Sequence, residues 1–99
     1  MQLRPSADAA LEAAVRTGLD LPTAHPLEAF GRQGNVSVLL QFARPADGTL
    51  AVAKTIPANS PFPEHHAREC DFYTHTRRPP CRGVSHAVSP AVIHMDLLT

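Results

Sequence analysis

The sequence predicts an α+β domain: a twisted antiparallel sheet of about five strands, one helix packed across it and a leading N-terminal helix. Three observations predict this class. An Ala-rich helical segment opens the chain, two apolar strand segments follow on either side of a hairpin turn, and a second helical segment precedes two further strand segments. Meandering strands with one interposed helix are typical of an antiparallel sheet with a helix on one face.

The leading helix is expected over residues 6–17. Ser6 is a suitable N-cap, and Gly18 can end the helix in the left-handed conformation. Leu11 and Val15 fall on one face of this helix together with alanines. Because alanine buries little area, we expect this helix to be held weakly against the rest of the domain.

A connector containing two prolines follows the first helix, and the character of the sequence then changes to β. We therefore divide the chain into 1–26, an N-terminal helix and connector, and 27–99, the main lobe. Strands are expected at residues 27–30, 36–43, 49–56, 84–88 and 91–98, with turns at 31–35 and 44–48 and a break at 77–83. The second helix is expected over 64–76, directly after Pro63.

Charge and composition argue against several partners. Nine Lys and Arg balance nine Asp and Glu, so the chain lacks the basic surplus of a nucleic-acid-binding domain. No apolar run approaches the roughly 18 residues of a membrane span, and we expect no signal peptide, because the Ala-rich N-terminal stretch carries charged residues. The two cysteines suit reduced thiols in the cytoplasm, and the excess of Arg over Lys suggests a bacterial, GC-rich source.

Three separated features together suggest a phosphate-binding site. Gly31, Gly34 and Asn35 lie in a predicted turn, where glycines let the backbone approach a phosphate closely. Lys54 is the only lysine and lies on the strand after the hairpin. Half buried there, its charge needs a carboxylate, which Glu69 of the following helix can supply.

These features, in this order, resemble the N-terminal lobe of the aminoglycoside phosphotransferase and choline kinase-like family, which is related to protein kinases. In that family a glycine loop covers the nucleotide phosphates, and the lysine of the third strand binds them and pairs with a helix glutamate. The sequence Arg68-Glu69 followed by Phe72-Tyr73 is also similar to the family's helix, and both aromatic side chains are expected to anchor it.

The resemblance extends from about residue 27 to residue 99 and implies a nucleotide partner. Residues 92–98 look like the strand that enters the hinge, where the backbone near Met95 and Leu97 would bind adenine. The implied function is transfer of the γ-phosphate of ATP to a hydroxyl group of a small molecule. The pattern departs from the family in His94-Met95-Asp96, where a Glu more often precedes the Asp.

The catalytic part of the family pattern is missing from these 99 residues. No His-Gly-Asp-type loop and no following metal-binding Asp are present, so we assign no catalytic residue and no metal ligand. Magnesium and an acceptor alcohol are implied only for an enzyme that also has a C-terminal lobe. We therefore expect a truncated lobe that is inactive alone.

Two other functions remain open on the sequence. The chain could be an interaction module that binds a partner through the apolar face on which a C-terminal lobe would dock. The same face could also support self-association. A small zinc protein is a further alternative, because several His and Cys side chains fall within a short stretch of sequence: His66, Cys70, His75, Cys81 and His86.

Overall fold

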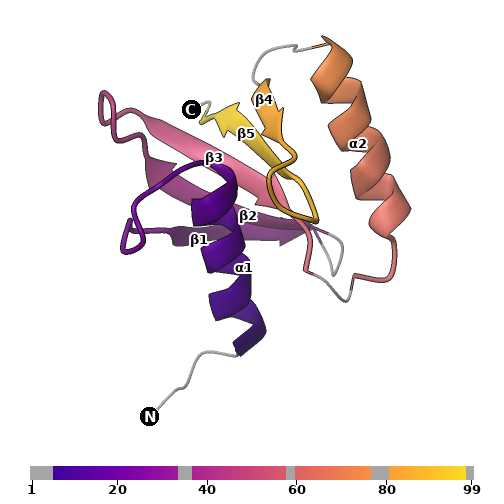
Figure 1. Ribbon diagram of the computed structural model, residues 1–99, viewed down its shortest axis with the longest axis horizontal. Coiled ribbons are helices and arrows are strands. Elements are labelled where there is room, and N and C mark those ends of the chain that lie inside the picture. The colour runs from indigo at the N-terminus through magenta and orange to yellow at the C-terminus, as the bar shows by residue number, and fades with distance from the viewer. Residues whose placement is uncertain (1–5, 34–36, 58–59, 77–80, 98–99) are drawn as a thin grey trace.

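The structure is a computed structural model that describes residues 6–33, 37–57, 60–76 and 81–97 (Figure 1). Its elements are α1 (Ser6–Gly18), β1 (Glu28–Gln33), β2 (Ser37–Ala43), β3 (Leu50–Thr55), α2 (Pro63–Thr76), β4 (Cys81–Ser85) and β5 (Val92–Asp96). The α+β class, the antiparallel sheet and the two helices confirm the corresponding sequence predictions. No helix within the described ranges is both long enough and apolar enough to cross a membrane.

The strands lie in the order β1-β2-β3-β5-β4, and every neighbouring pair is antiparallel. This order places β3 at the centre of the sheet. The chain leaves β3, forms α2, and returns through β4 at the edge before β5 inserts beside β3. A central strand is covered by a neighbour on each side, so a side chain on β3 is shielded from solvent along both flanks.

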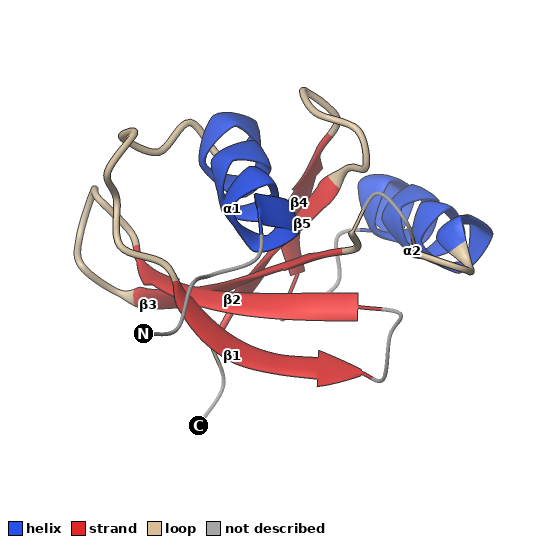
Figure 2. Ribbon diagram, turned by 90° about the horizontal axis from the view of Figure 1, so that it is seen from below, coloured by secondary structure: helices blue, strands red, loops and turns tan. Residues whose placement is uncertain are grey.

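The two helices contact opposite faces of the sheet at β5. Val92 packs in one cluster with Val15 of α1, whereas its neighbour Ile93 packs in a second cluster with Cys70 of α2. Successive side chains of a strand point to opposite faces, which explains why adjacent residues serve different helices. Figure 2 shows β4 and β5 passing between α1 and α2.

The larger core lies under α1. Its buried members come from four elements and are Val15, Val38, Leu40, Phe42, Ala51, Ala53 and Val92. The cluster under α2 is smaller and consists of Cys70, Cys81 and Ile93, with Tyr73, Val84, Ala91 and Met95 packed around it. The hydrophobic contribution to stability is therefore concentrated on the α1 face.

The end of α1 differs from the prediction. Gly18 was expected to take the left-handed conformation, but that conformation is found at Asp20, with φ of 56°. Gly18 is needed instead for space, because a Cβ there would lie 3.0 Å from Val88 Cγ2 and 3.3 Å from Val92 Cγ2. The glycine thus lets the last turn of α1 approach β5 closely.

Two predicted boundaries in the sheet are wrong. The turn expected at 31–35 begins later, because Gly31 to Gln33 pair with Leu39 to Ser37 and extend β1. The break expected at 77–83 ends earlier, because Cys81 already pairs with Met95 in β4, which stops at Ser85. In both cases backbone pairing with an adjacent strand overrides the local turn signal of Gly and Pro.

The rotation of α2 corrects one further prediction. His66, Cys70 and Tyr73 face the sheet at a spacing of four and three residues, and the first two are buried. Phe72 falls two residues after Cys70, on the opposite side of the helix, and is 49% exposed. Of the two aromatic residues expected to anchor the helix, only Tyr73 therefore packs against the core.

Candidate nucleotide-binding site

The predicted ion pair between Lys54 and Glu69 is present. Lys54 Nζ donates a hydrogen bond to Glu69 Oε2 across 2.9 Å, joining the central strand β3 to α2. The lysine side chain is only 12% exposed and the glutamate side chain 32%. The charge of the lysine is thus largely removed from water and is balanced by one carboxylate that still reaches solvent.

The position of the pair follows from two local patterns. On β3, Ala51 and Ala53 face the core under α1. Because strand side chains alternate, Val52 and Lys54 point to the opposite face. On α2, burial of Cys70 fixes the rotation of the helix, and the adjacent Glu69 is carried to the edge of the contact with the sheet. Strand alternation and helix rotation together bring the two charges into contact.

The contact with Glu69 uses part of the hydrogen-bonding capacity of Lys54. An ammonium group has three N–H donors, and within the described part of the chain Glu69 supplies the polar contact of Nζ. A phosphate group next to a lysine already held by a carboxylate is a familiar arrangement in phosphoryl transfer.

Gly31 lies in the same row of the sheet as Lys54. Gly31 is opposite Leu39 in β2, Leu39 is opposite Lys54 in β3, and Lys54 is opposite Ile93 in β5. The register of β1 shifts between Ala29 and Gly31, which marks a bulge at this row. Gly34 and Asn35, the other predicted phosphate-loop residues, lie outside the described residues.

The two predicted adenine-binding positions are in different environments. Met95 lies inside the sheet, opposite Val52 on one side and Cys81 on the other, and its side chain packs on the cluster under α2. Leu97 follows the last residue of β5 and is outside the strand. Since sheet pairing engages the backbone within a strand, Leu97 is better placed than Met95 to offer backbone groups to a ligand.

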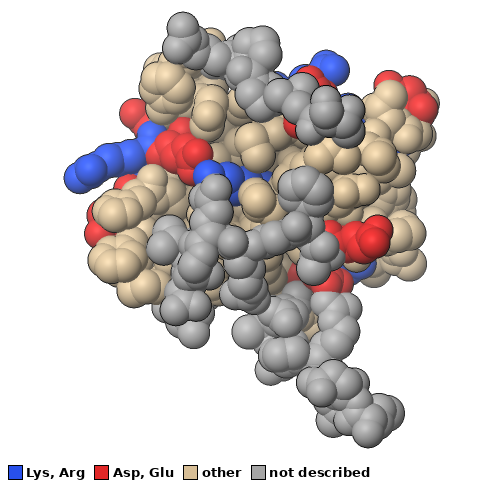
Figure 3. All heavy atoms as spheres, turned by 180° about the vertical axis from the view of Figure 1, so that it is seen from behind, with Lys and Arg blue, Asp and Glu red and all other residues tan. Residues whose placement is uncertain are grey.

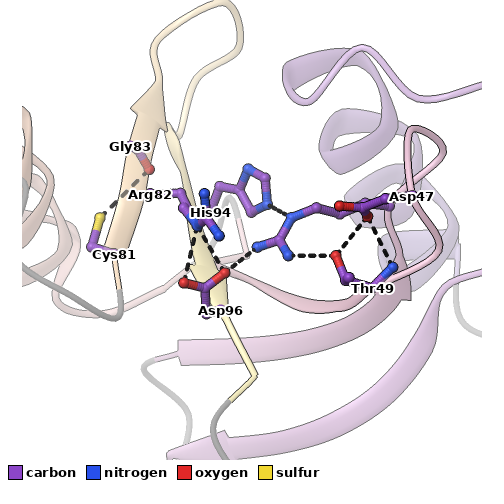
Figure 4. Close-up of polar contacts among 8 residues, drawn as sticks. Asp47, Thr49, Cys81, Arg82, Gly83, His94 and Asp96 are labelled. Atoms are coloured by element: carbon purple, nitrogen blue, oxygen red, sulfur yellow. Dashed lines mark hydrogen bonds and ion pairs between the residues drawn. The ribbon is translucent and has the colours of Figure 1, made fainter.

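A second polar cluster, which the sequence analysis did not identify, joins β4 and β5 to the turn between β2 and β3 (Figure 4). Arg44, just after β2, donates from Nη2 to Asp96 Oδ1 at 2.6 Å, from Nε to His94 Nε2 at 3.0 Å and from Nη1 to Thr49 Oγ1 at 2.9 Å. Arg82 of β4 donates from Nε to both carboxylate oxygens of Asp96, at 2.8 and 3.0 Å. All three guanidinium nitrogens of Arg44 therefore donate hydrogen bonds.

This cluster sets the protonation of its members. Hydrogen bonds from Arg82, and next from Arg44, hold the pKa of Asp96 below its ordinary value. Burial, followed by the positive charges of Arg44 and Arg82, lowers the pKa of His94. Beside the cluster, the backbone N–H and hydroxyl of Thr49 donate to Asp47 Oδ1 and lower the pKa of that carboxyl group. His94 accepts from Arg44 and is therefore neutral.

The cysteine and histidine side chains of α2 and β4 meet only in part. Cys70 Sγ lies 3.4 Å from His66 Nε2, but Cys70 and Cys81 form no disulfide. Across the described ranges, no three His, Cys, Asp or Glu side chains are arranged to hold a metal ion. Burial raises the pKa of the Cys70 thiol to about 11, so the sulfur is a protonated, buried group at neutral pH.

Charged side chains do not gather by sign on the surface drawn in Figure 3. Among its coloured residues, acidic and basic side chains lie next to one another. No family model, no curated protein and no solved structure matches this chain. The roles given to individual residues therefore depend on their own geometry.

Proposed function

We propose that this chain forms the nucleotide-binding half of an ATP-dependent phosphotransferase that acts on a hydroxyl group of a small molecule, similar to aminoglycoside phosphotransferases and choline kinases. Lys54 contacts the phosphates and Glu69 holds Lys54 in place. The observation that carries the proposal is the 2.9 Å contact between Lys54 Nζ and Glu69 Oε2, at the central strand of the sheet.

The placement of this pair supports the proposal more than its existence does. The family resemblance expects the lysine on the third strand and the glutamate on the next helix, and these elements are β3 and α2. In protein kinases the same type of ion pair must be formed for the nucleotide phosphates to be bound productively. Gly31, in the same row of the sheet two strands away, is in a position to approach the same phosphates.

The proposal limits the chain to binding and orientation. Lys54 holds the phosphates through its ammonium group, and the backbone at Leu97 is the position offered to adenine. The sequence has no His-Gly-Asp-type loop, and the described residues contain no cluster of carboxylates that would hold magnesium. A base for the acceptor hydroxyl and the magnesium ligands must therefore come from elsewhere in a working enzyme.

The test is a titration of the uniformly ¹⁵N-labelled chain with ATP, followed by NMR. We expect saturable shifts of the amides at Gly31, Lys54 and Leu97. Lys54→Ala should weaken ATP binding about ten-fold or more, whereas Lys54→Arg, which keeps the charge, should weaken it less. Equal ATP affinities of the parent chain and Lys54→Ala would refute the role of Lys54.

A matched pair of helix variants tests the role of Glu69. Glu69→Gln removes the charge that holds Lys54 and should weaken ATP binding several-fold. Glu64→Gln removes an exposed carboxylate from the first turn of the same helix, so it changes the net charge equally without touching the pair. If both variants strengthen ATP binding alike, through lower repulsion of the phosphates, Glu69 has no specific role.

A further inference from the structure

A pocket of ≈ 300 Å³ opens between the end of α1 and the strands β4 and β5. Leu19 and Asp20 line it from the helix end, and Gly83, Ser85 and His94 line it from the strands. Gly83 leaves room for a ligand here, because a Cβ built on it would meet no atom beyond its chain neighbours within 4 Å. The pocket thus combines open space above β4 with a wall that carries three polar side chains.

His94 offers a hydrogen-bond donor at this pocket. Arg44 Nε donates to His94 Nε2 at 3.0 Å, so Nε2 is the unprotonated nitrogen and Nδ1 carries the hydrogen of the neutral ring. Among the described residues Nδ1 has no hydrogen-bond partner, and unlike His66 Nδ1 it is not sealed from the surface. Val92 packs under α1, so His94, two residues further along β5, faces the same side of the sheet.

Two further polar groups at the pocket are unused. Ser85 Oγ accepts from the Ala87 amide at 3.4 Å, and within the described ranges its hydroxyl hydrogen has no acceptor. A Cβ at Gly18 would lie 3.5 Å from this oxygen, which places the hydroxyl group beside the helix end. The Asp20 carboxylate makes no hydrogen bond or ion pair to any residue that the structure describes. Asp20 also has φ of 56°, a conformation for which glycine or asparagine is usual at a helix end, so capping alone does not explain its charge.

The charges around the pocket indicate the charge of its ligand. Beside His94, the guanidinium groups of Arg44 and Arg82 are matched by the carboxylates of Asp96 and Asp47. That end of the pocket is electrically balanced and suits a neutral oxygen that accepts hydrogen bonds. The carboxylate at the end of α1 is unbalanced among the described residues, and an ammonium group is its natural partner.

From these contacts we infer that the pocket binds a small organic cation, whose ammonium group pairs with Asp20 and whose neutral carbonyl oxygen accepts from His94 Nδ1 and Ser85 Oγ. The volume is at the lower end for ligand pockets. Amino acid amides carry both groups on one carbon atom and are small enough for this space. The inference is independent of the proposed nucleotide site, because Lys54 and Glu69 do not line this pocket.

Three compounds of similar size separate the contributions of the two groups. Alaninamide has the ammonium group and the carbonyl oxygen, isobutyramide has methyl in place of the ammonium group, and sec-butylamine has ethyl in place of the carboxamide. Each is titrated into the ¹⁵N-labelled chain at neutral pH, and binding is located from the amides of Leu19, Gly83 and Ser85. We expect saturable shifts with alaninamide and about ten-fold weaker binding of the other two, because each lacks one of the proposed contacts.

A matched pair of variants tests the carboxylate. Asp20→Asn removes the charge and keeps a residue that tolerates the left-handed conformation, so it should abolish the advantage of alaninamide over isobutyramide. Asp71→Asn changes the net charge equally at a side chain that is 76% exposed and does not line the pocket, so it should leave that advantage unchanged. Ser85→Ala removes one donor to the carbonyl oxygen and should reduce the advantage of alaninamide over sec-butylamine.

Each contrary result overturns the inference. Equal binding of alaninamide and isobutyramide by the parent chain would show that no carboxylate selects the cation. The same loss of preference in Asp71→Asn as in Asp20→Asn would show a response to net charge alone. Absence of saturation by alaninamide at about 20 mM, where a ligand of millimolar affinity is mostly bound, would show that the pocket holds only water. The three compounds alone decide the inference on the parent chain, even if a variant fails to fold.

Discussion

The two ion clusters of this sheet differ in how completely their donors are used. Each nitrogen of the Arg44 guanidinium donates to a protein acceptor, and Asp96 receives hydrogen bonds from two arginines. Among the residues that the structure describes, Lys54, by contrast, makes one polar contact, to Glu69. Both clusters include a side chain that is largely removed from solvent. In the proposed function this difference separates two roles: the cluster of Arg44 holds neighbouring strands and the turn after β2 together, whereas Lys54 would use its further donors to bind phosphate.

The elements joined by each cluster agree with this distinction. Arg44, Asp96 and Arg82 connect the turn after β2 with β5 and β4, all within the sheet. Lys54 and Glu69 connect the sheet to a helix whose apolar contact is the small cluster around Cys70. A contact between two elements that are joined by few others is easier to adjust when a ligand binds.

The largest effect on stability is expected at Arg44. Arg44→Ala removes three hydrogen bonds and should lower the free energy of unfolding by about 2 kcal/mol, as measured by urea denaturation. Arg82→Ala is the matched control, because its side chain is 61% exposed and contacts the same carboxylate. That variant should cost less than about 1 kcal/mol. Similar losses for both arginines would contradict the structural role of Arg44.

A smaller effect is expected when the Lys54 pair is replaced by apolar residues. The double variant Lys54→Met, Glu69→Leu fills the same space, and replacement of a desolvated ion pair in this way is often neutral or stabilising. We expect its free energy of unfolding to stay within about 1 kcal/mol of the parent value, while binding of ATP is lost. A loss as large as that of Arg44→Ala would mean that this pair also serves mainly to hold the fold together.

The Cys70 thiol should make stability fall at alkaline pH. Its pKa is raised from 9.0 to about 11 in the folded chain, so above pH 9 the unfolded chain loses a proton that the folded chain keeps. Stability contributed by the protonated thiol is therefore lost as pH rises from about 9 to 11. Cys70→Ala should show a shallower fall in Tm over this range, and an identical fall would contradict the burial of the thiol.

The smallest expected effect comes from His94 at mildly acidic pH. Burial and the nearby arginines lower its pKa from 6.5, so the unfolded chain binds a proton before the folded chain does. The stability from neutral His94 is complete above pH 6.5 and is lost as pH falls through the lowered pKa. His94→Gln should therefore reduce this acid-side slope of Tm relative to the parent chain. Equal slopes in His94→Gln and the parent chain would contradict the effect assigned to His94.

The ion pair of Lys54 and Glu69 could be predicted because a half-buried lysine on a strand needs a carboxylate, and the next helix carries one. The order of these residues along the chain, which resembles the kinase-like pattern, indicated the same pair. Helical spacing argues against Phe72 as an anchor, yet its aromatic character led to the opposite expectation. The exposure of Phe72 shows that position on a helix outweighs residue type.

The cluster around Arg44 and Asp96 could not be predicted from patterns along the sequence. Arg44 and Asp96 are 52 residues apart, and their contact depends on the insertion of β5 beside β3. The sequence shows that Arg44 follows an apolar strand, but this position does not indicate which residue Arg44 contacts. Gly18 was noticed as a helix terminator, but its function depends on Val88 and Val92, which only the folded chain brings near.

The central claim, that Lys54 binds phosphate while paired with Glu69, can be observed directly because Lys54 is the only lysine of the chain. Lysine labelled with ¹³C at Cε gives one side-chain signal, which is followed during titration with ATP, with inorganic triphosphate and with adenosine. The account predicts saturable shifts of that signal with ATP and triphosphate, no comparable shift with adenosine, and weaker saturation in Glu69→Gln. A Lys54 signal that stays unchanged at saturating ATP, or one that moves equally with adenosine, would contradict the account.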